Sequence, residues 1–266
     1  MNQAKEDLVI IKISGNIIDD EASLECFLKD LSAVQGHKIL VHGGGVMATQ
    51  LAKELGIEQK MIEGRRITDQ DTLKIVTMVY AGYINKKIVA ILQANHSNAL
   101  GLTGADGNSI KAHKRKNANL NYGFVGDVDE VNVELFKQLL SNKILPVIAP
   151  ITHNGEGQLL NTNADTIAQE IARSLSNYFN VQLVYIFEKP GVLQDAEDES
   201  TVIPHLHYSY YQQLKSKGLI FAGMIPKLDN AFTALNSGVQ KITIGSADHL
   251  SSVLNGQSGT TILKDE

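Results

Sequence analysis

Two short segments that end predicted buried strands combine glycine with a side chain that can bind an anion. They are Lys12-Ile13-Ser14-Gly15, at the end of the apolar run 8–13, and His42-Gly43-Gly44-Gly45, directly after the run 38–41. Glycine lets backbone amides approach a phosphate closely, and ligands of parallel α/β sheets bind at the carboxyl ends of the strands. The pattern therefore favours a phosphate site. A flexible turn and a surface lysine are the alternatives.

The glycine segments lack two well-known phosphate-transfer signatures. The sequence contains no G-x-x-x-x-G-K-[ST] segment and no H-R-D or D-F-G triplet, which argues against P-loop NTPases and protein kinases. A dinucleotide fingerprint remains an alternative, because Gly43-x-Gly45-x-x-Ala48 fits G-x-G-x-x-A and Glu63 follows about twenty residues later. Glu63, however, lies in a polar segment beside Gly64-Arg65-Arg66 and not at the end of a second strand, which weakens this alternative.

Two later segments place polar or charged side chains at predicted helix N-termini. Asn161-Thr162-Asn163-Ala164-Asp165 precedes a helix, and N-capping accounts for its composition, although these groups at the ligand edge of the sheet also suit a binding site. Lys227 ends the segment Gly223-Met224-Ile225-Pro226-Lys227 and begins another predicted helix. A cation there opposes the helix dipole unless an anion is nearby. This conflict favours a functional role for Lys227.

Strands alternate with helices along most of the chain, as judged by apolar periodicity. The predicted strands are residues 8–13, 38–41, 145–151, 182–187 and 241–244, and the predicted helices are 21–34, 47–55, 72–95, 135–141, 165–175, 209–217 and 227–237. This alternation predicts a mainly parallel sheet with helices on both faces. Two polar segments, 57–68 and 102–128, interrupt the alternation and are interpreted as hairpins or lids.

Composition narrows the function classes. The chain has 266 residues, 43% of them hydrophobic, and a formal net charge of −5, which predicts a folded domain with a sizeable core and argues against a broad nucleic-acid footprint. Cys26 is the only cysteine, so an internal disulfide is impossible and a reducing compartment is favoured. No apolar run reaches eighteen residues and no signal-peptide pattern is present. We expect a cytoplasmic protein without a membrane segment.

Taken together, five motifs resemble those of the acetylglutamate kinases of the amino acid kinase family. In chain order they are K-x-x-G at 12–15, V-H-G-G-G at 41–45, G-x-R-x-T at 64–68, N-x-N-A-D at 161–165 and G-M-x-x-K at 223–227. The resemblance covers nearly the whole chain and implies a three-layer αβα sandwich around an open, mainly parallel sheet. It also implies transfer of the γ-phosphoryl group of ATP to the γ-carboxylate of N-acetyl-L-glutamate.

The resemblance assigns the phosphoryl-transfer roles to two lysines and an aspartate. Lys12 and Lys227 would hold the migrating phosphoryl group from opposite sides, and Asp165 would orient both ammonium groups. The amides expected along the phosphoryl path are those of Gly15, Gly44 and Gly45. Arg66 would grip the α-carboxylate of the acceptor with its planar fork, and Asn161 would complete that contact.

The resemblance places the nucleotide in the C-terminal part of the chain. ATP would contact the loop after the strand 182–187 and the stretch before Lys227, at Glu188, Lys189, Gly191, Val192, Leu219, Ile220 and Phe221. Magnesium would be held by phosphates and water, without a dedicated set of protein ligands. Ser14 stands where the family usually has glycine, and Phe187-Glu188-Lys189-Pro190-Gly191 replaces a Ser/Thr-Asp-Val-x-Gly loop.

The resemblance also suggests how the chain is divided and assembled. Residues 1–180 would form an acceptor lobe with a lid at 57–68, and residues 181–266 a nucleotide lobe on the same sheet. The arginine-inhibited hexamers of the family carry a long N-terminal helical extension that is lacking here, so we expect an arginine-insensitive homodimer with residues 72–95 at its interface. N-succinyl-L-glutamate is an alternative acceptor, and a sensing module without turnover is an alternative of another class.

Overall fold

An eight-stranded sheet forms the centre of the computed structural model, which describes residues 4–62, 65–118, 120–195, 197–220 and 224–265. Its strand order is β12-β14-β13-β11-β1-β2-β8-β5. These strands are β1 (Glu6–Ile13), β2 (His37–His42), β5 (Ala99–Leu102), β8 (Leu145–Ile148), β11 (Phe179–Phe187), β12 (His205–His207), β13 (Lys241–Ser246) and β14 (Thr260–Leu263). Neighbouring strands pair in parallel except β13 and β14. The prediction of an open, mainly parallel sheet is confirmed.

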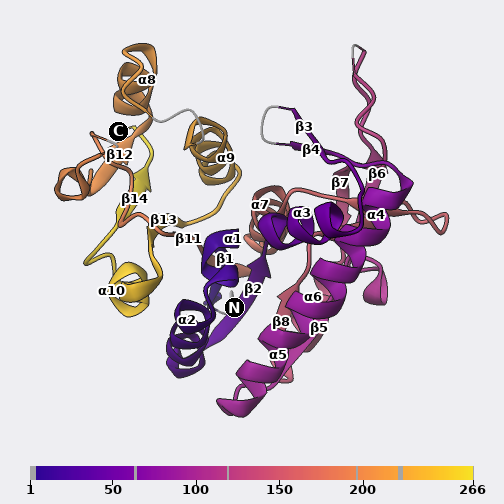
Figure 1. Cartoon of the computed structure of the whole chain (residues 1–266). Helices are drawn as coiled ribbons and strands as arrows, with labels where there is room; N and C mark the ends of the chain where they lie inside the picture. Colours follow the sequence, from indigo (N-terminus) through magenta and orange to yellow (C-terminus); the bar gives the residue numbers. More distant parts are fainter. Residues whose placement is uncertain (1–3, 63–64, 119, 196, 221–223, 266) are drawn as a thin grey trace.

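Helices cover both faces of this sheet and produce three layers (Figure 1). One face carries α6 (Val133–Ser141), α7 (Ala164–Leu175), α8 (Tyr208–Ser216) and α9 (Ile225–Asn236). The other carries α1 (Gly15–Asp19), α2 (Glu21–Ala33), α3 (Gly45–Glu54), α4 (Gln70–Val76), the π-helical segment η1 (Thr77–Ile84), α5 (Asn85–Ala94) and α10 (Leu250–Asn255). In β1, Ile10 packs on the first face and Ile11 on the second. Strand alternation therefore directs Lys12 toward the face that carries α7 and α9.

Both polar segments form β structure outside the central sheet. The first is a hairpin of β3 (Lys60–Ile62) and β4 (Arg65–Ile67). The second contributes β6 (Ile110–Lys114) and β7 (Gly126–Val131) to a four-stranded sheet that also contains β9 (Ile151–His153) and β10 (Leu159–Asn161). In Figure 1 the β3–β4 hairpin stands above α3, and the β6–β7 hairpin rises beside it at the upper right. The hairpin interpretation is confirmed for both segments.

One predicted strand is wrong. Residues 145–151 read as a single strand, but β8 ends at Ile148 and β9 begins at Ile151 in the other sheet. Pro150, which has no amide hydrogen for a ladder, lies between the two strands. The chain therefore leaves the central sheet here and carries residues 151–161 over the ends of the central strands. That transfer puts Asn161 beside the ligand edge of the sheet.

The predicted helix 72–95 is one continuous helical segment, Gln70–Ala94, with a π-helical middle. By length and composition alone it could cross a membrane, with 44% of its most apolar window buried in the fold. Ile75, Val76, Ile84 and Ile88 belong to the packed core on the second face of the sheet. The helix therefore carries apolar residues because it packs against the sheet, although Met78 and Tyr83 remain more than half exposed.

The C-terminal region contains three elements that the periodicity did not predict. These are β12, α10 and the antiparallel strand β14, each six residues or shorter. Periods of 2 and 3.6 residues are poorly sampled in such short segments, so their type was decided by the partners they pack on. Short 3₁₀ turns lie at Asp106–Asn108, Glu199–Thr201 and Ala247–His249.

Candidate active site

The two glycine segments come together at the carboxyl ends of β1 and β2, which pair in parallel. A side-chain carbon added at Gly15 would lie 3.9 Å from the backbone nitrogen of Gly45. Gly44 has φ +143°, and an added Cβ would meet Ile84 Cδ1 at 2.3 Å, so both conformation and space require glycine there. Gly15 and Gly45 each begin a helix, α1 and α3, so free amides of two helix N-termini point into one space.

Arg66 lies in the β3–β4 hairpin and folds back onto the second glycine segment. Its side chain is nearly buried, with 8% exposure. Its Nη2 donates to the carbonyl of Gly45 at 2.8 Å and to Thr49 Oγ1 at 2.9 Å, and its Nη1 donates to Gln59. A side-chain hydrogen bond also joins Arg66 to Tyr80, and the fixed cation lines the pocket.

Asp165 and Lys12 form an ion pair at the other end of the site. The distance from Lys12 Nζ to Asp165 Oδ1 is 2.7 Å, and both side chains are mostly buried. Asn163 caps α7 by accepting from the Thr166 amide at 3.0 Å, which places Asp165 in the first turn of the helix. The ion pair with Lys12 engages Asp165 Oδ1. The buried Ser14 Oγ, two residues after Lys12, has no hydrogen-bond partner among the described residues.

Lys227 reaches the same place from α9. Its Nζ lies 3.8 Å from the centroid of the Phe187 ring, and Lys12 Nζ lies 5.4 Å from that centroid. Burial lowers the pKa of Lys227, and the Lys12 charge lowers it further, while Asp165 and Glu188 oppose the change. Two ammonium groups separated by more than 200 residues therefore gather around one ring and one carboxylate.

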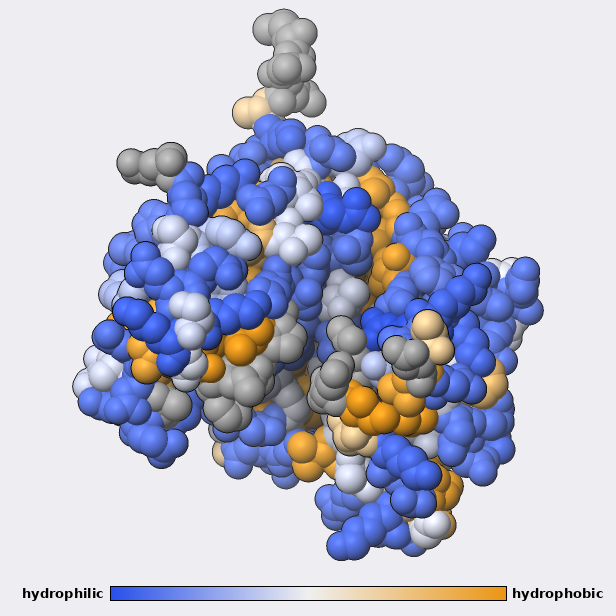
Figure 2. All heavy atoms as spheres, turned by 90° about the horizontal axis from the view of Figure 1, so that it is seen from above, coloured by the Kyte–Doolittle hydropathy of each residue, from blue (hydrophilic) through white to orange (hydrophobic). Residues whose placement is uncertain are grey.

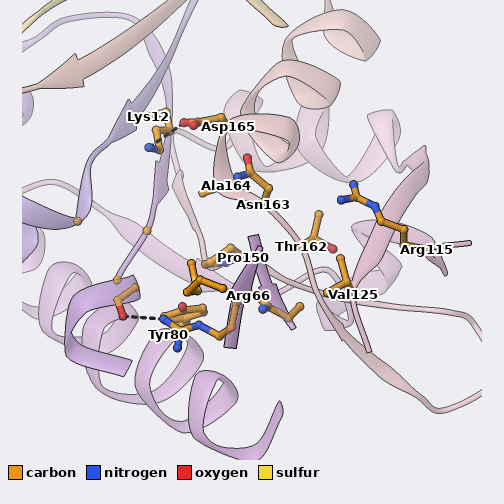
Figure 3. A pocket seen from close by; sticks show the side chains of 16 residues that line it. Lys12, Arg66, Tyr80, Arg115, Val125, Pro150, Thr162, Asn163, Ala164 and Asp165 are labelled. Carbon is orange, nitrogen blue, oxygen red and sulfur yellow. Dashed lines mark hydrogen bonds and ion pairs between the residues drawn. The ribbon is translucent and has the colours of Figure 1, made fainter. Parts of the chain in front are cut away.

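A pocket extends between these two ends (Figure 3). Lys12 and Asp165 lie at one end, Arg66 and Tyr80 at the other, and Arg115 forms a third wall. Arg115 is oriented by Asp127, which accepts from its Nε at 3.0 Å, and this pairing raises the pKa of Arg115. Other lining residues include Met61, Val125, Pro150, Asn161, Thr162 and Asn163. In Figure 2 the face seen from above is hollowed between two largely hydrophilic halves.

His42 supports the glycine loop from beneath. The imidazole is fully buried, its Nδ1 lies 2.8 Å from the Gly43 carbonyl, and its Nε2 lies 3.1 Å from Asn85 Nδ2. Because a carbonyl only accepts and an amide NH₂ only donates, Nδ1 carries the hydrogen and Nε2 accepts. Burial lowers the pKa of His42 to about 4, so the ring is neutral at pH 7. It links the loop to the helix Gln70–Ala94 rather than moving a proton.

Sequence comparison identifies the family. The profile described as "Amino acid kinase family" matches residues 7–246. The chain belongs to the amino acid kinase family. Curated relatives named acetylglutamate kinase share 52% identity over 260 residues in Bacteroides fragilis (98% of each chain) and 54% over 251 residues in Cytophaga hutchinsonii (94% of this chain, 95% of the relative).

Solved structures share the fold of this chain. The structure of smu.665 from Streptococcus mutans matches this amino acid kinase with a TM-score of 0.81 and 26% identity, covering 97% of this chain and 99% of the other. A carbamate kinase from Giardia lamblia bound to AMP-PNP matches with a TM-score of 0.70 and 16% identity, covering 98% and 99%. The second likeness shows the fold alone. It supports the three-layer architecture described above.

Most residues singled out from the sequence meet in this amino acid kinase. Seven of them line the one pocket: Lys12, Gly15, Gly44, Gly45, Arg66, Asn161 and Asp165. Lys227 joins them through Phe187. Asn161 Nδ2 donates to Thr68 Oγ1 at 3.0 Å, which ties the N-x-N-A-D segment to the end of the hairpin. The polar cluster that N-capping alone could explain is therefore part of the pocket wall.

The residues predicted to bind nucleotide differ in their exposure and in their contacts. Glu188 accepts from Asn16 and lies close enough to Lys227 to raise its pKa, and Lys189 is exposed and pairs with Glu199 at 2.9 Å. Val192 is buried, and its amide donates to Thr260 Oγ1 at 2.8 Å. Gly191 is crowded by Thr260 and Val202, Leu219 is half exposed and Ile220 is buried. Phe221 lies outside the described residues.

Several residues at the site were not predicted from the sequence, among them Arg115, Tyr80 and Phe187. Arg115 and Tyr80 line the pocket, and Phe187 contacts both lysines. Arg115 was hidden in a polar run with Lys114 and Lys116, and no local signal separates it from its neighbours. For Phe187, the only signal in the sequence was its position at the end of a predicted buried strand. An ordinary core residue would occupy the same position.

Proposed function

We propose that this protein is an ATP-dependent kinase that phosphorylates the γ-carboxylate of N-acetyl-L-glutamate to N-acetyl-L-glutamyl 5-phosphate in arginine biosynthesis. The observation that carries the proposal is the convergence of Lys12 and Lys227 near Asp165, at one end of a pocket whose other end holds Arg66. The full-length relatives named acetylglutamate kinase support the choice of acceptor.

The acceptor would lie between the two ends of the pocket. Arg66 is held in place by Gly45 and Thr49 and lines the pocket, so its guanidinium can bind the α-carboxylate at a fixed position. Asn161 lies on the pocket wall beside it and completes that contact. With the α-carboxylate at Arg66, the γ-carboxylate extends toward Lys12. An ionised carboxylate is already a nucleophile, so alignment is the main requirement.

The lysines would stabilise the charge of the migrating phosphoryl group. Lys12 approaches from β1 and Lys227 from α9, and Asp165 keeps Lys12 in place through the 2.7 Å ion pair. The backbone amides of Gly15, Gly44 and Gly45 supply fixed dipoles along the path. Such preorganised groups act strongly where water is excluded. The β3–β4 hairpin, which carries Arg66, serves as the lid that excludes it.

ATP is assigned to residues 181–266 and the acceptor to residues 1–180, two lobes that share the central sheet. The nucleotide would contact Glu188, Lys189, Gly191 and Val192, and the Leu219–Phe221 stretch. Magnesium would neutralise phosphate charge when bound with ATP. The described residues contain no group of three or more His, Cys, Asp or Glu side chains that could hold a metal, and a cation held by phosphates and water suits that donor set.

We further infer a cytoplasmic homodimer that binds neither nucleic acid nor membrane. Met78 and Tyr83, at 54% and 58% exposure, lie on the helix Gln70–Ala94 and are the side chains we place in the dimer interface. Exposed apolar side chains that gather on one helix favour burial against a partner. Light scattering of the wild type and of Tyr83→Asp tests this, since only the variant is expected to be monomeric.

N-Succinyl-L-glutamate is a second candidate acceptor, and one observation favours it. Arg115 adds a second guanidinium to the pocket wall, away from Arg66. A carboxylate at the end of the acyl group could pair with it, whereas an acetyl group could not. The alternative of a sensing module without turnover is tested in the same assay.

The deciding experiment measures acyl phosphate with hydroxylamine, and ADP release in parallel, with N-acetyl- and N-succinyl-L-glutamate offered separately. We expect acceptor-dependent ADP release with N-acetyl-L-glutamate, and loss of turnover by orders of magnitude in Lys227→Met. Binding without ADP release would identify a sensing module. Faster trapping with the succinyl compound, abolished by Arg115→Gln, would assign that substrate instead.

A further inference from the structure

Phe187, the last residue of β11, contacts both lysines of the site through its ring. Lys227 Nζ lies 3.8 Å from the ring centroid, within the range of a close cation–π contact, and Lys12 Nζ lies 5.4 Å away. The two cations come from β1 and α9, which are distant in the chain. The ring is therefore a surface that both cations share.

The ring is held rigidly. Phe187 is 8% exposed and belongs to the core cluster packed by α7 and α9. Tyr185, two residues earlier on the same face of β11, is fully buried and parallel to it, with an interplanar angle of 3° and centroids 6.3 Å apart. In the sheet, Tyr185 is the register partner of Lys12, and Phe187 is the partner of Ser246. Pairing of β11 with β1 on one side and β13 on the other thus fixes the backbone that carries both rings.

The charges around the ring explain why an aromatic surface suits this position. Lys12 is already paired with Asp165, while the second cation, Lys227, is largely withdrawn from water, repelled by Lys12 and attracted by the charges of Asp165 and Glu188. A carboxylate beneath Lys227 would hold it in a strong ion pair and compete with phosphate. The face of an aromatic ring attracts a cation through its quadrupole and leaves the N–H groups free to donate.

We infer that Phe187 is a positioning residue for phosphoryl transfer, whose ring holds the ammonium group of Lys227, and secondarily that of Lys12, where the phosphoryl group passes. This inference rests on the kinase activity proposed above and adds to it a residue that touches neither substrate in that scheme. The ring holds the Lys227 ammonium group between the two substrate positions before ATP and the acceptor bind. Less side-chain conformational entropy is therefore lost when they bind.

The test replaces the π face while keeping the bulk of the side chain. Phe187→Leu is expected to lower kcat by about 2- to 30-fold, the range of a partly desolvated cation–π contact, with the KM for the acylglutamate nearly unchanged. Phe187→Tyr keeps the ring and is expected to restore kcat to within about twofold. Fluorinated phenylalanines at position 187 weaken the face of the ring with little change in size, and kcat should fall with each added fluorine.

Phe179→Leu is the matched control. Phe179 begins the same strand, is 9% exposed and belongs to the same core cluster, but it stacks edge-on with His37 at the opposite end of β11. If packing alone were lost, kcat would fall by a similar factor in Phe187→Leu and Phe179→Leu. Circular dichroism melts of both variants measure how much stability each one loses.

Equal kcat losses in the two leucine variants, or a kcat independent of fluorination, would overturn the inference. The fluorinated series answers the question even if Phe187→Leu folds poorly, because it leaves packing intact. These results are separate from the fate of the proposed function. If the wild type releases no ADP with any acylglutamate, the proposed function fails, whereas an active wild type with unchanged ring variants refutes only the role of Phe187.

Discussion

Acidification is expected to destabilise this protein through one buried imidazole, that of His42. The ring is fully buried, and burial, aided by the Lys86 charge, lowers its pKa from 6.5 to about 4, while the hydrogen bond to Gly43 opposes this. Protonation would place a hydrogen on Nε2, which now accepts from Asn85. The unfolded chain therefore binds a proton at His42 at a higher pH than the folded state does.

The sign and size of the effect follow from linkage. Between pH 6.5 and about 4 the imidazole of His42 is protonated in the unfolded state but not in the folded state. The contribution of His42 to the free energy of unfolding is therefore fully present above pH 6.5 and is lost as the pH falls. At about 1.4 kcal/mol per pH unit, the loss from this group is about 2 kcal/mol at pH 5 and reaches about 3 kcal/mol below pH 4.

Urea unfolding of the wild type and of His42→Gln at pH 7 and pH 5 measures this quantity. The variant lacks the titrating ring, so its free energy of unfolding should fall about 2 kcal/mol less between the two pH values than that of the wild type. Carboxylates that titrate in the same range contribute to both proteins and cancel in the difference. His205→Gln, which removes an exposed imidazole on β12, is the control and should follow the wild type.

Identical pH dependence in the wild type and His42→Gln would refute the reasoning. A histidine Cε1 resonance assigned to His42 that titrates near pH 6.5 would refute it independently, because it would mean that burial costs the charged ring nothing. A loss of stability between pH 7 and pH 5 that is as small in His205→Gln as in His42→Gln would show that the effect is not specific to the buried ring.

Three further outcomes are expected. Lys227 must be charged to stabilise phosphate, and burial lowers its pKa. We therefore expect kcat to fall as the pH rises through a value below 10.5, and Lys227→Arg to move this fall to higher pH. If the fall occurs at the same pH in Lys227→Arg, another group is responsible for it. Arg66→Ala should raise the KM for the acylglutamate by about 10- to 100-fold, the value of a lost charged hydrogen bond, with kcat nearly retained; unchanged KM with lower kcat would contradict its role. Gly44→Ala, which forces a Cβ to 2.3 Å from Ile84 Cδ1 at φ +143°, should lower stability by about 1–3 kcal/mol, and an unchanged melting temperature would show that the loop relaxes freely.

The sequence by itself determined the parts of the site that depend on local structure. A buried strand followed by glycine and then a helix is a local pattern, and it correctly placed Gly15 and Gly43–Gly45 at one edge of a parallel sheet. The helix beginning at Ile225 carries Lys227 in its first turn, as the sequence predicted. These features succeed because hydrogen bonding and periodicity act over a few residues.

Only the tertiary structure decided which distant side chains meet. Nothing near Arg115 in the sequence shows that it enters the pocket, and nothing near Phe187 shows that two lysines share its ring. The break at Pro150, which moves β9 into a second sheet, looked like a continuous strand. Such contacts depend on how helices and sheets that are distant in the chain pack together, because burial, strand register and charge pairing act jointly there. The local periodicity of the sequence does not reveal them.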